Sequence, residues 1–277
     1  MLHLDPNDLQ TPKLHGYLLG AIGPRPICFA STVDQEGQVN LAPYSFFNVF
    51  SARPPVLIFS PARRVRDNTV KHTLENVQAV PEVVINVVNY SMVQQMSLAS
   101  TEYPKGINEF VKAGFTMEPS ELIKPPRVKE APVQLECKVI DVVSLGTEGG
   151  AGNLVMAEVV RLHIDEQILN DEGQIHPEKI DLVSRMGGNW YSRAKSGLFE
   201  VAKPNSDLGI GIDALPQAIR QSTVLCGNDL AQLANVSVLP EGAHKDSGKN
   251  LEAHQQAKAL IEQGDVQQAW QILINEY

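Results

Sequence analysis

The sequence lacks several features that mark particular classes of protein. No apolar run reaches the ~20 residues of a membrane-spanning helix, and residues 1–6 lack the basic and apolar regions of a secretory signal peptide. The three cysteines, Cys28, Cys137 and Cys226, lie far apart and form no Cys-x-x-Cys pair. We therefore expect a cytoplasmic protein without a membrane span, in which Cys28 and Cys137 are buried, unreactive thiols within strands.

The motifs of common catalytic and metal sites are missing too. The seven histidines are scattered, without a pair at helical i, i+4 spacing, and no Gly-x-Ser-x-Gly motif occurs. Residues 209–214 match Gly-x-Gly-x-x-Ala, but no strand precedes them and Pro216 interrupts any helix that they could open. We predict no metal site and assign no catalytic side chain. A bound cofactor that carries the chemistry would need only binding and orientation from the protein.

Positive charge is scarce overall and concentrated in one segment. The formal net charge is −9, yet residues 63–73 hold three arginines and one lysine against a single aspartate. Nucleic acid is not expected as a partner, because neutralising its phosphates requires a broad basic surface. The segment is either a solvated basic loop or a site for a small anion, held by arginine forks, the lysine charge and hydroxyl donors.

The hydrophobic pattern predicts mainly strands up to about residue 196. We expect strands at residues 26–33, 39–47, 55–60, 83–88, 133–145 and 154–165. We expect helices after an N-cap at Thr11, after an N-cap at Thr73, and around residues 91–99 and 107–113. Many strands with few strand–helix alternations favour an antiparallel barrel over a doubly wound sheet. The glycine-rich residues 146–152 are predicted to be a mobile hairpin connection.

The character of the sequence changes beyond residue 196. Residues 203–207 are predicted to be a linker, and residues 251–277 a pair of helices separated by Gly264 and Asp265. The pair resembles one unit of a helical repeat, and we expect its apolar faces to pack on the barrel or across a dimer. We divide the chain into a barrel domain, residues 1–200, and a linker with a helical extension, residues 201–277.

Short motifs occur in a fixed order over roughly residues 10–195. They are Pro-Arg-Pro-Ile at 24–27, Ser-Thr-Val-Asp at 31–34, Asn-Leu-Ala-Pro-Tyr-Ser-Phe-Phe-Asn at 40–48, Pro-Pro at 54–55, Lys-His-Thr-Leu-Glu-Asn at 71–76, Val-Ile-Asn-Val-Val at 84–88, Lys-Pro-Pro-Arg-Val at 124–128, Leu-Glu-Cys at 135–137 and Arg-Met-Gly-Gly-Asn-Trp-Tyr-Ser-Arg at 185–193. As an ordered set they resemble the flavin reductase-like family of FMN-binding split barrels. His72 departs from the aspartate usual in the family, and the C-terminal extension lies outside the family pattern.

The resemblance implies an antiparallel split β-barrel with peripheral helices that binds FMN and forms a homodimer. It implies that the FMN phosphate is held by Ser60, Arg63, Lys71 and Thr73, with Arg64 as the alternative to Arg63 because the loop length varies. It implies that the isoalloxazine ring is lined by residues of the first hairpin, namely Ser31, Thr32, Ser45, Phe46, Phe47 and Asn48. Ordinary hairpin packing is the alternative for these six residues.

The implied reaction is hydride transfer from NAD(P)H to flavin. An electron carrier with tightly held FMN and a flavin-binding interaction protein that docks a partner with its helical tail remain alternatives. Tyr191 and Arg193 either approach the partner subunit's flavin or pack the end of the barrel. No motif distinguishes NADH from NADPH, and the electron acceptor and the role of the C-terminal extension stay open.

Overall fold

The computed structural model describes residues 1–201, 209–244, 247 and 250–275. Its contacts divide the chain into two compact units, Met1–Leu198 and Phe199–Tyr277. The predicted linker at residues 203–207 lies outside the described residues. Within the described part, no helix is long and apolar enough to cross a membrane.

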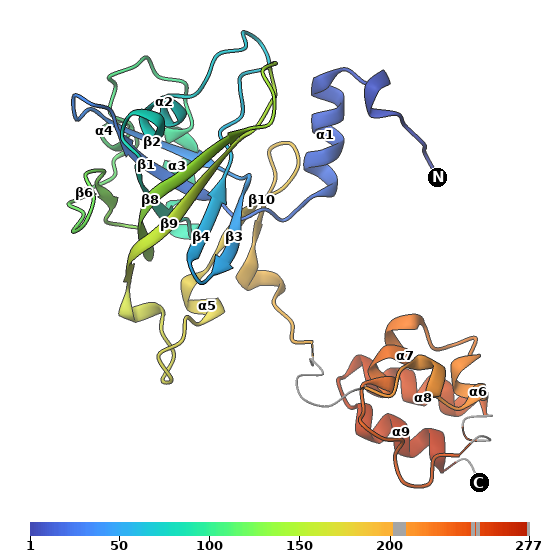
Figure 1. Cartoon of the computed structure of the whole chain (residues 1–277). Helices are drawn as coiled ribbons and strands as arrows, with labels where there is room; N and C mark the ends of the chain where they lie inside the picture. Colours follow the sequence, from blue (N-terminus) through green and yellow to red (C-terminus); the bar gives the residue numbers. More distant parts are fainter. Residues whose placement is uncertain (202–208, 245–246, 248–249, 276–277) are drawn as a thin grey trace. The chain divides into compact units, whose positions relative to one another are not determined.

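The first unit is built on a seven-stranded sheet in which every neighbouring pair is antiparallel (Figure 1). The strand order is β2-β1-β5-β8-β9-β4-β3. The strands are β1 (Cys28–Val33), β2 (Val39–Tyr44), β3 (Phe47–Ala52), β4 (Pro55–Phe59), β5 (Glu82–Val87), β8 (Val133–Ser144) and β9 (Asn153–Ile164). Two small sheets pair β6 (Met117–Glu118) with β7 (Arg127–Val128) and β10 (Val183–Arg185) with β11 (Tyr191–Arg193).

The connection between β2 and β3 shows that the sheet closes on itself. These strands are the two edges of the sheet, yet only Ser45 and Phe46 separate them in the chain. Three Cα–Cα steps span at most ~11 Å, so the sheet curls until its edges lie close together. No ladder joins the edges in the described part, which is the split of an antiparallel split barrel. The strand predicted at residues 39–47 is confirmed for residues 39–44, but the chain bends at residues 45–46 and Phe47 begins β3.

Five helices flank the barrel, and two predicted helix caps are displaced. They are α1 (Thr11–Ala21), α2 (His72–Ala79), α3 (Val93–Ala99), α4 (Glu109–Ala113) and α5 (Pro177–Ile180). Gln10 rather than Thr11 occupies the cap of α1, and Lys71 rather than Thr73 occupies the cap of α2. Thr73 cannot cap its helix because its side chain is turned to the sheet, where Asn40 and Tyr44 contact it.

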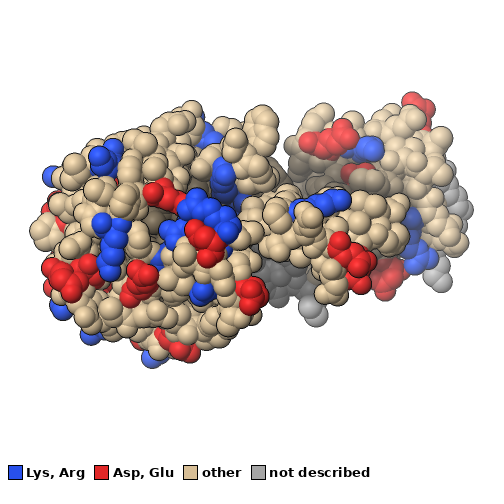
Figure 2. All heavy atoms as spheres, turned by 90° about the horizontal axis from the view of Figure 1, so that it is seen from above, with Lys and Arg blue, Asp and Glu red and all other residues tan. Residues whose placement is uncertain are grey.

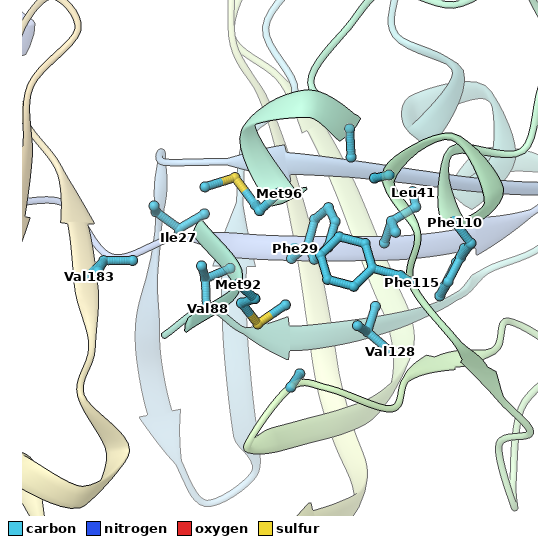
Figure 3. Close-up of a cluster of buried hydrophobic side chains, with 13 residues drawn as sticks. Ile27, Phe29, Leu41, Val88, Met92, Met96, Phe110, Phe115, Val128 and Val183 are labelled. Atoms are coloured by element: carbon cyan, nitrogen blue, oxygen red, sulfur yellow. The ribbon is translucent and has the colours of Figure 1, made fainter. Parts of the chain in front are cut away.

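All six residues of β1 are buried. Because side chains alternate along a strand, both faces of β1 are therefore covered. Cys28 and Ala30 lie in the barrel interior with Leu74 of α2. Phe29 points to the opposite face, where α3 and α4 bring Met96 and Phe110 over the sheet (Figure 3). The predicted burial of two thiols is confirmed: burial raises the pKa of Cys28, and raises that of Cys137 to about 12.

The second unit has a core of its own. Its helices are α6 (Gln217–Arg220), α7 (Gly227–Ala234), α8 (Leu251–Glu262) and α9 (Val266–Ile274). The predicted break between α8 and α9 is confirmed, with Gly264 at φ 85° and the Asp265 side chain accepting from the Gln268 N–H. The apolar faces of this pair share a core with Ile219 and Leu233 of the same unit. Residues 212–214 form a short 3-10 helix rather than a dinucleotide-binding helix.

Candidate cofactor site

The basic segment forms a loop, residues 61–71, that connects β4 to α2 and is called the basic loop below. Arg63 closes this loop on itself. Its Nε and Nη2 atoms donate to the side-chain oxygen and the carbonyl oxygen of Asn68, both at 2.6 Å. Asn68 adopts the left-handed conformation, with φ 55°. The Arg63 guanidinium is thus engaged inside the loop and does not join the other cations of the segment.

The glycine-rich residues 146–152 pack against the basic loop, and Figure 1 shows the tip of the β8–β9 hairpin beside it. The Arg63 N–H donates to the Ala151 carbonyl at 2.8 Å, and the Gly150 N–H donates to the Arg63 carbonyl at 3.0 Å. A Cβ atom at Gly149 would lie 3.0 Å from the carbonyl oxygens of Arg64 and Val65. The expected mobile connection is therefore held in place, and its glycines let two backbones approach closely.

Ser60 takes part in the same junction. Its hydroxyl accepts from the Asn153 N–H at 3.1 Å, and its own N–H donates to the Phe46 carbonyl at 2.9 Å. The residue is buried, at 8% exposure. Ser60 thus links the end of β4 to both the glycine-rich turn and the hairpin bend at Phe46.

Three cations of the basic loop converge on one carboxylate, Glu102, from the segment that follows α3. Glu102 Oε1 lies 3.0 Å from Arg64 Nε and 3.1 Å from Lys71 Nζ, and Oε2 lies 2.6 Å from Arg66 Nη2. Hydrogen bonds from Lys71 and Arg64 lower the pKa of Glu102 to about 2. Arg66 also contacts Asp67 at 3.1 Å. Figure 2 shows basic side chains gathered around acidic ones on this side of the barrel unit.

The first turn of α2 is fastened to the sheet by buried polar contacts. The Thr73 hydroxyl is fully buried and accepts from Asn40 Nδ2 and from the Tyr44 hydroxyl, both at 2.8 Å. One turn later, Asn76 Nδ2 donates to the Thr32 hydroxyl at 3.1 Å. Burial raises the pKa of Tyr44, so its phenol stays protonated and able to donate. The side chains of Thr73 and Thr32 therefore position α2, whose first N–H groups have no partner within the helix.

The hairpin residues separate into a buried and an exposed group. Ser31 is fully buried, and its hydroxyl has no hydrogen-bond partner in the described part of the chain. Strand alternation places Ser31 on the side of Phe29 and Thr32 on the opposite side. The exposed group is the bend and the start of β3, where Ser45 and Phe47 are half-buried and Phe46 and Asn48 are exposed.

Phe46 also contacts the N-terminal helix. Its ring meets the His15 ring of α1 edge to face, with centroids 6.1 Å apart. The structure thus brings residues 45–48, Ser60 and the basic loop to one region. It does not bring the side chains of Ser31 and Thr32 to that surface.

Arg64, Arg66 and Lys71 are called the cationic cluster below. A cavity of ≈ 330 Å³ opens beside this cluster. Its walls come from the basic loop, Lys71, Glu102 and Gly150, and from Thr11 and His15 of α1. Planar arginine forks and a lysine charge next to a cavity suit a phosphate group, and the start of α2 adds the positive end of a helix. The residues present therefore fit the phosphate of a flavin nucleotide.

Several contacts at this site were not predicted from sequence. The sequence did not predict that Arg64 and Arg66 pair with Glu102. Glu102 lies 31 positions beyond Lys71 in the chain, so no local pattern could have connected the two. Arg193 binds Asp181 at 2.6 Å and lies over the Tyr90 ring at 3.8 Å, within its own unit.

The sequence model of the family described as "Flavin reductase like domain" matches residues 21–179. The chain belongs to the flavin reductase-like domain family. An uncharacterized protein of Aquifex aeolicus is 38% identical over 181 residues, which are 65% of this chain and 90% of that protein. The family match ends before Phe199, so the second unit lies outside it.

Two solved structures share the fold of this flavin reductase-like chain. Nitrilotriacetate monooxygenase component B from Bacillus cereus is 32% identical with a TM-score of 0.67, covering 73% of this chain and 98% of that one. A putative flavin reductase with a split barrel domain from Shewanella frigidimarina is 25% identical with a TM-score of 0.62, covering 73% and 100%. The predicted split-barrel fold is confirmed, and family membership supports a flavin-related oxidoreductase.

Proposed function

We propose that the protein is an NAD(P)H-dependent FMN reductase whose first unit binds FMN. The observation that carries the proposal is the convergence of Arg64, Arg66 and Lys71 on a single anionic group beside the ≈ 330 Å³ cavity. FMN ends in a phosphate monoester, which carries about two negative charges at neutral pH. The two phosphates of FAD form a pyrophosphate with one charge on each phosphate, so a group of three cations around one anionic group favours FMN.

The protein's own residues would bind and orient the cofactor. Arg64 and Lys71 would hold the phosphate, and the buried contacts of Thr73 would keep the N-terminus of α2 directed at it. The exposed bend around Phe46 and Asn48 would lie along the flavin ring. Bound FMN would supply the hydride chemistry, and we assign no side chain to proton transfer.

We also propose that the protein is a homodimer. Tyr17 and Leu18 of α1 and Ile22 directly after it are 45%, 52% and 64% exposed, and in the edge strand β3, Val49 and Phe50 are 63% and 64% exposed. Grouped apolar side chains on the surface are typical of interaction sites, and an uncovered edge strand invites pairing. Light scattering on the purified protein should give twice the monomer mass.

The function is tested on the full-length protein saturated with FMN. Under anaerobic conditions, NADH or NADPH should bleach the visible absorption band of the flavin. The same titration with riboflavin, which has no phosphate, should require more flavin to reach saturation. Bound flavin that neither nicotinamide bleaches would contradict the reductase and favour the electron carrier or the interaction protein. A protein that does not bind FMN would contradict all three.

A further inference from the structure

The cationic cluster is already occupied by a group of the chain itself. Both carboxylate oxygens of Glu102 are used, one on Arg64 and Lys71 and the other on Arg66, at 2.6–3.1 Å. Two of these side chains, Arg64 and Lys71, are also the charges that the proposed function assigns to the FMN phosphate. The Glu102 carboxylate and the FMN phosphate therefore require the same cations, which cannot bind both anions fully at the same time.

The position of Glu102 strengthens this conclusion. Arg64, Lys71 and Glu102 line the ≈ 330 Å³ cavity and also a neighbouring cavity of ≈ 40 Å³, which reaches His72 and Thr73 at the start of α2. These three residues thus form the wall that the two cavities share. The Glu102 carboxylate is thus part of the wall between the larger cavity and the N-terminus of α2.

The cluster is also exposed enough for the carboxylate to leave it. The Glu102 side chain is 36% exposed, and the side chains of Arg66, Lys71 and Arg64 are 71%, 32% and 16% exposed. Ion pairs at such positions contribute little individually because water and salt screen them. A carboxylate on the segment after α3 can therefore be exchanged for a stronger anion at a modest cost.

We infer that Glu102 is a built-in competitor for the flavin phosphate, which makes bound FMN an exchangeable substrate rather than a permanently held group. The inference rests on the proposed function. In the flavin-free protein Glu102 pairs with Arg64, Arg66 and Lys71 and offsets part of their charge. A phosphate with two negative charges displaces it, and when the flavin leaves, Glu102 returns, so the cations are never left unpaired during release.

The test compares the wild-type protein with Glu102→Gln and with Glu75→Gln as a matched control. Both variants remove one negative charge near the start of α2. Glu75 is exposed and makes no ion pair within the described residues. Binding of FMN and of riboflavin is measured by fluorescence quenching, release by stopped flow, and folding by circular dichroism.

Glu102→Gln should bind FMN about tenfold more tightly, mainly through slower release, because three weak ion pairs no longer compete. Its affinity for riboflavin should stay unchanged, and inorganic phosphate should inhibit its FMN binding at lower concentration. Glu75→Gln should bind FMN within about twofold of the wild type. The wild-type protein should lose FMN during desalting, whereas Glu102→Gln should retain more of it.

Unchanged or weaker FMN binding by folded Glu102→Gln, in a wild-type protein that prefers FMN to riboflavin, would overturn the inference and leave the proposed function standing. A wild-type protein that retains FMN fully through desalting would overturn it as well. Absence of FMN binding in the wild type and both variants would overturn the proposed function, and the inference with it.

Discussion

At the scale of single residues, the site is decided by which cations reach Glu102. Arg63 binds Asn68 inside the basic loop. Arg64 also binds Thr69 and the Val70 carbonyl inside the loop through Nη1, but its Nε meets Glu102 together with Lys71. The sequence predicted a cationic segment and named Lys71, but it could not rank the two neighbouring arginines. Their roles depend on where the loop bends, and that bend is set by Asn68 in a left-handed conformation.

The first prediction separates the two arginines. Arg64→Ala should weaken FMN binding roughly tenfold or more, because it removes a charge-assisted hydrogen bond to the phosphate, and Lys71→Ala should do the same. Riboflavin affinity should change little in either variant. The measurement is fluorescence titration with both flavins. Equal losses for FMN and riboflavin would contradict the assignment of these residues to the phosphate.

The second prediction concerns pH. Arg64, Arg66 and Lys71 face Glu102 and lower its pKa from an ordinary 4.5 to about 2. The stabilisation from these pairs is therefore complete above pH ~4.5 and is lost as the pH falls toward 2. Between pH 5.5 and 8 Glu102 stays ionised, so the ratio of FMN affinities between Glu102→Gln and wild type should be constant. A ratio that changes between pH 5.5 and 8 would contradict this prediction.

At the scale of elements, the site depends on how α2 and the glycine-rich turn are attached to the barrel. Thr73 was predicted as a cap and phosphate ligand, yet its hydroxyl is buried against Asn40 and Tyr44. The sequence could predict the helix but not its rotation, because rotation follows from which side chains the sheet presents. Similarly, Gly149 lies against the basic loop only because β8 and β9 are long enough to carry their turn there.

The third prediction tests the attachment of α2. Thr73→Val keeps the shape of the side chain but leaves the Asn40 amide and the Tyr44 hydroxyl without their buried acceptor. It should lower the free energy of unfolding by about 1–3 kcal/mol in urea denaturation. Thr73→Ser, which keeps the hydroxyl, should lose clearly less. A Thr73→Val protein as stable as the wild type would show that these contacts do not hold the helix.

The fourth prediction tests the packing of the glycine-rich turn. In Gly149→Ala the added Cβ atom would lie 3.0 Å from two carbonyl oxygens, so the basic loop must move. We expect weaker FMN binding, with little change in the fold by circular dichroism. Gly197→Ala is the control, since a Cβ atom there meets nothing within 4 Å. If both variants bind FMN like the wild type, the turn does not support the basic loop.

At the scale of the whole molecule, the chain combines a family barrel with a separate helical unit. The second unit buries Trp270 and Leu273 among its own helices, and Trp270 Nε1 donates to the Leu233 carbonyl at 3.1 Å. The sequence predicted the change in character near residue 196 and the α8–α9 pair. It did not predict α6 and α7, whose short segments supply the rest of this core.

The fifth prediction follows from this division. A protein ending at Leu198 should remain folded and bind FMN with an affinity within about twofold of the full-length protein, because the cationic cluster and its cavity lie within the first unit. Fluorescence titration and light scattering on the truncated protein test this. Loss of FMN binding in a folded, dimeric truncation would show that the second unit contributes to the site.

The sequence by itself determined what is local: the positions of most strands, the burial of Cys28 and Cys137, the basic segment, and the ordered motifs of a flavin reductase-like barrel. These follow from side-chain alternation, turn residues and short spacings, which neighbouring residues specify. Tertiary structure alone decided that Glu102 forms ion pairs with the cations, that residues 146–152 pack against the basic loop, and that the Thr73 side chain faces the sheet. Each of these contacts joins segments far apart in the chain, and only the closure of the sheet and its register bring them together.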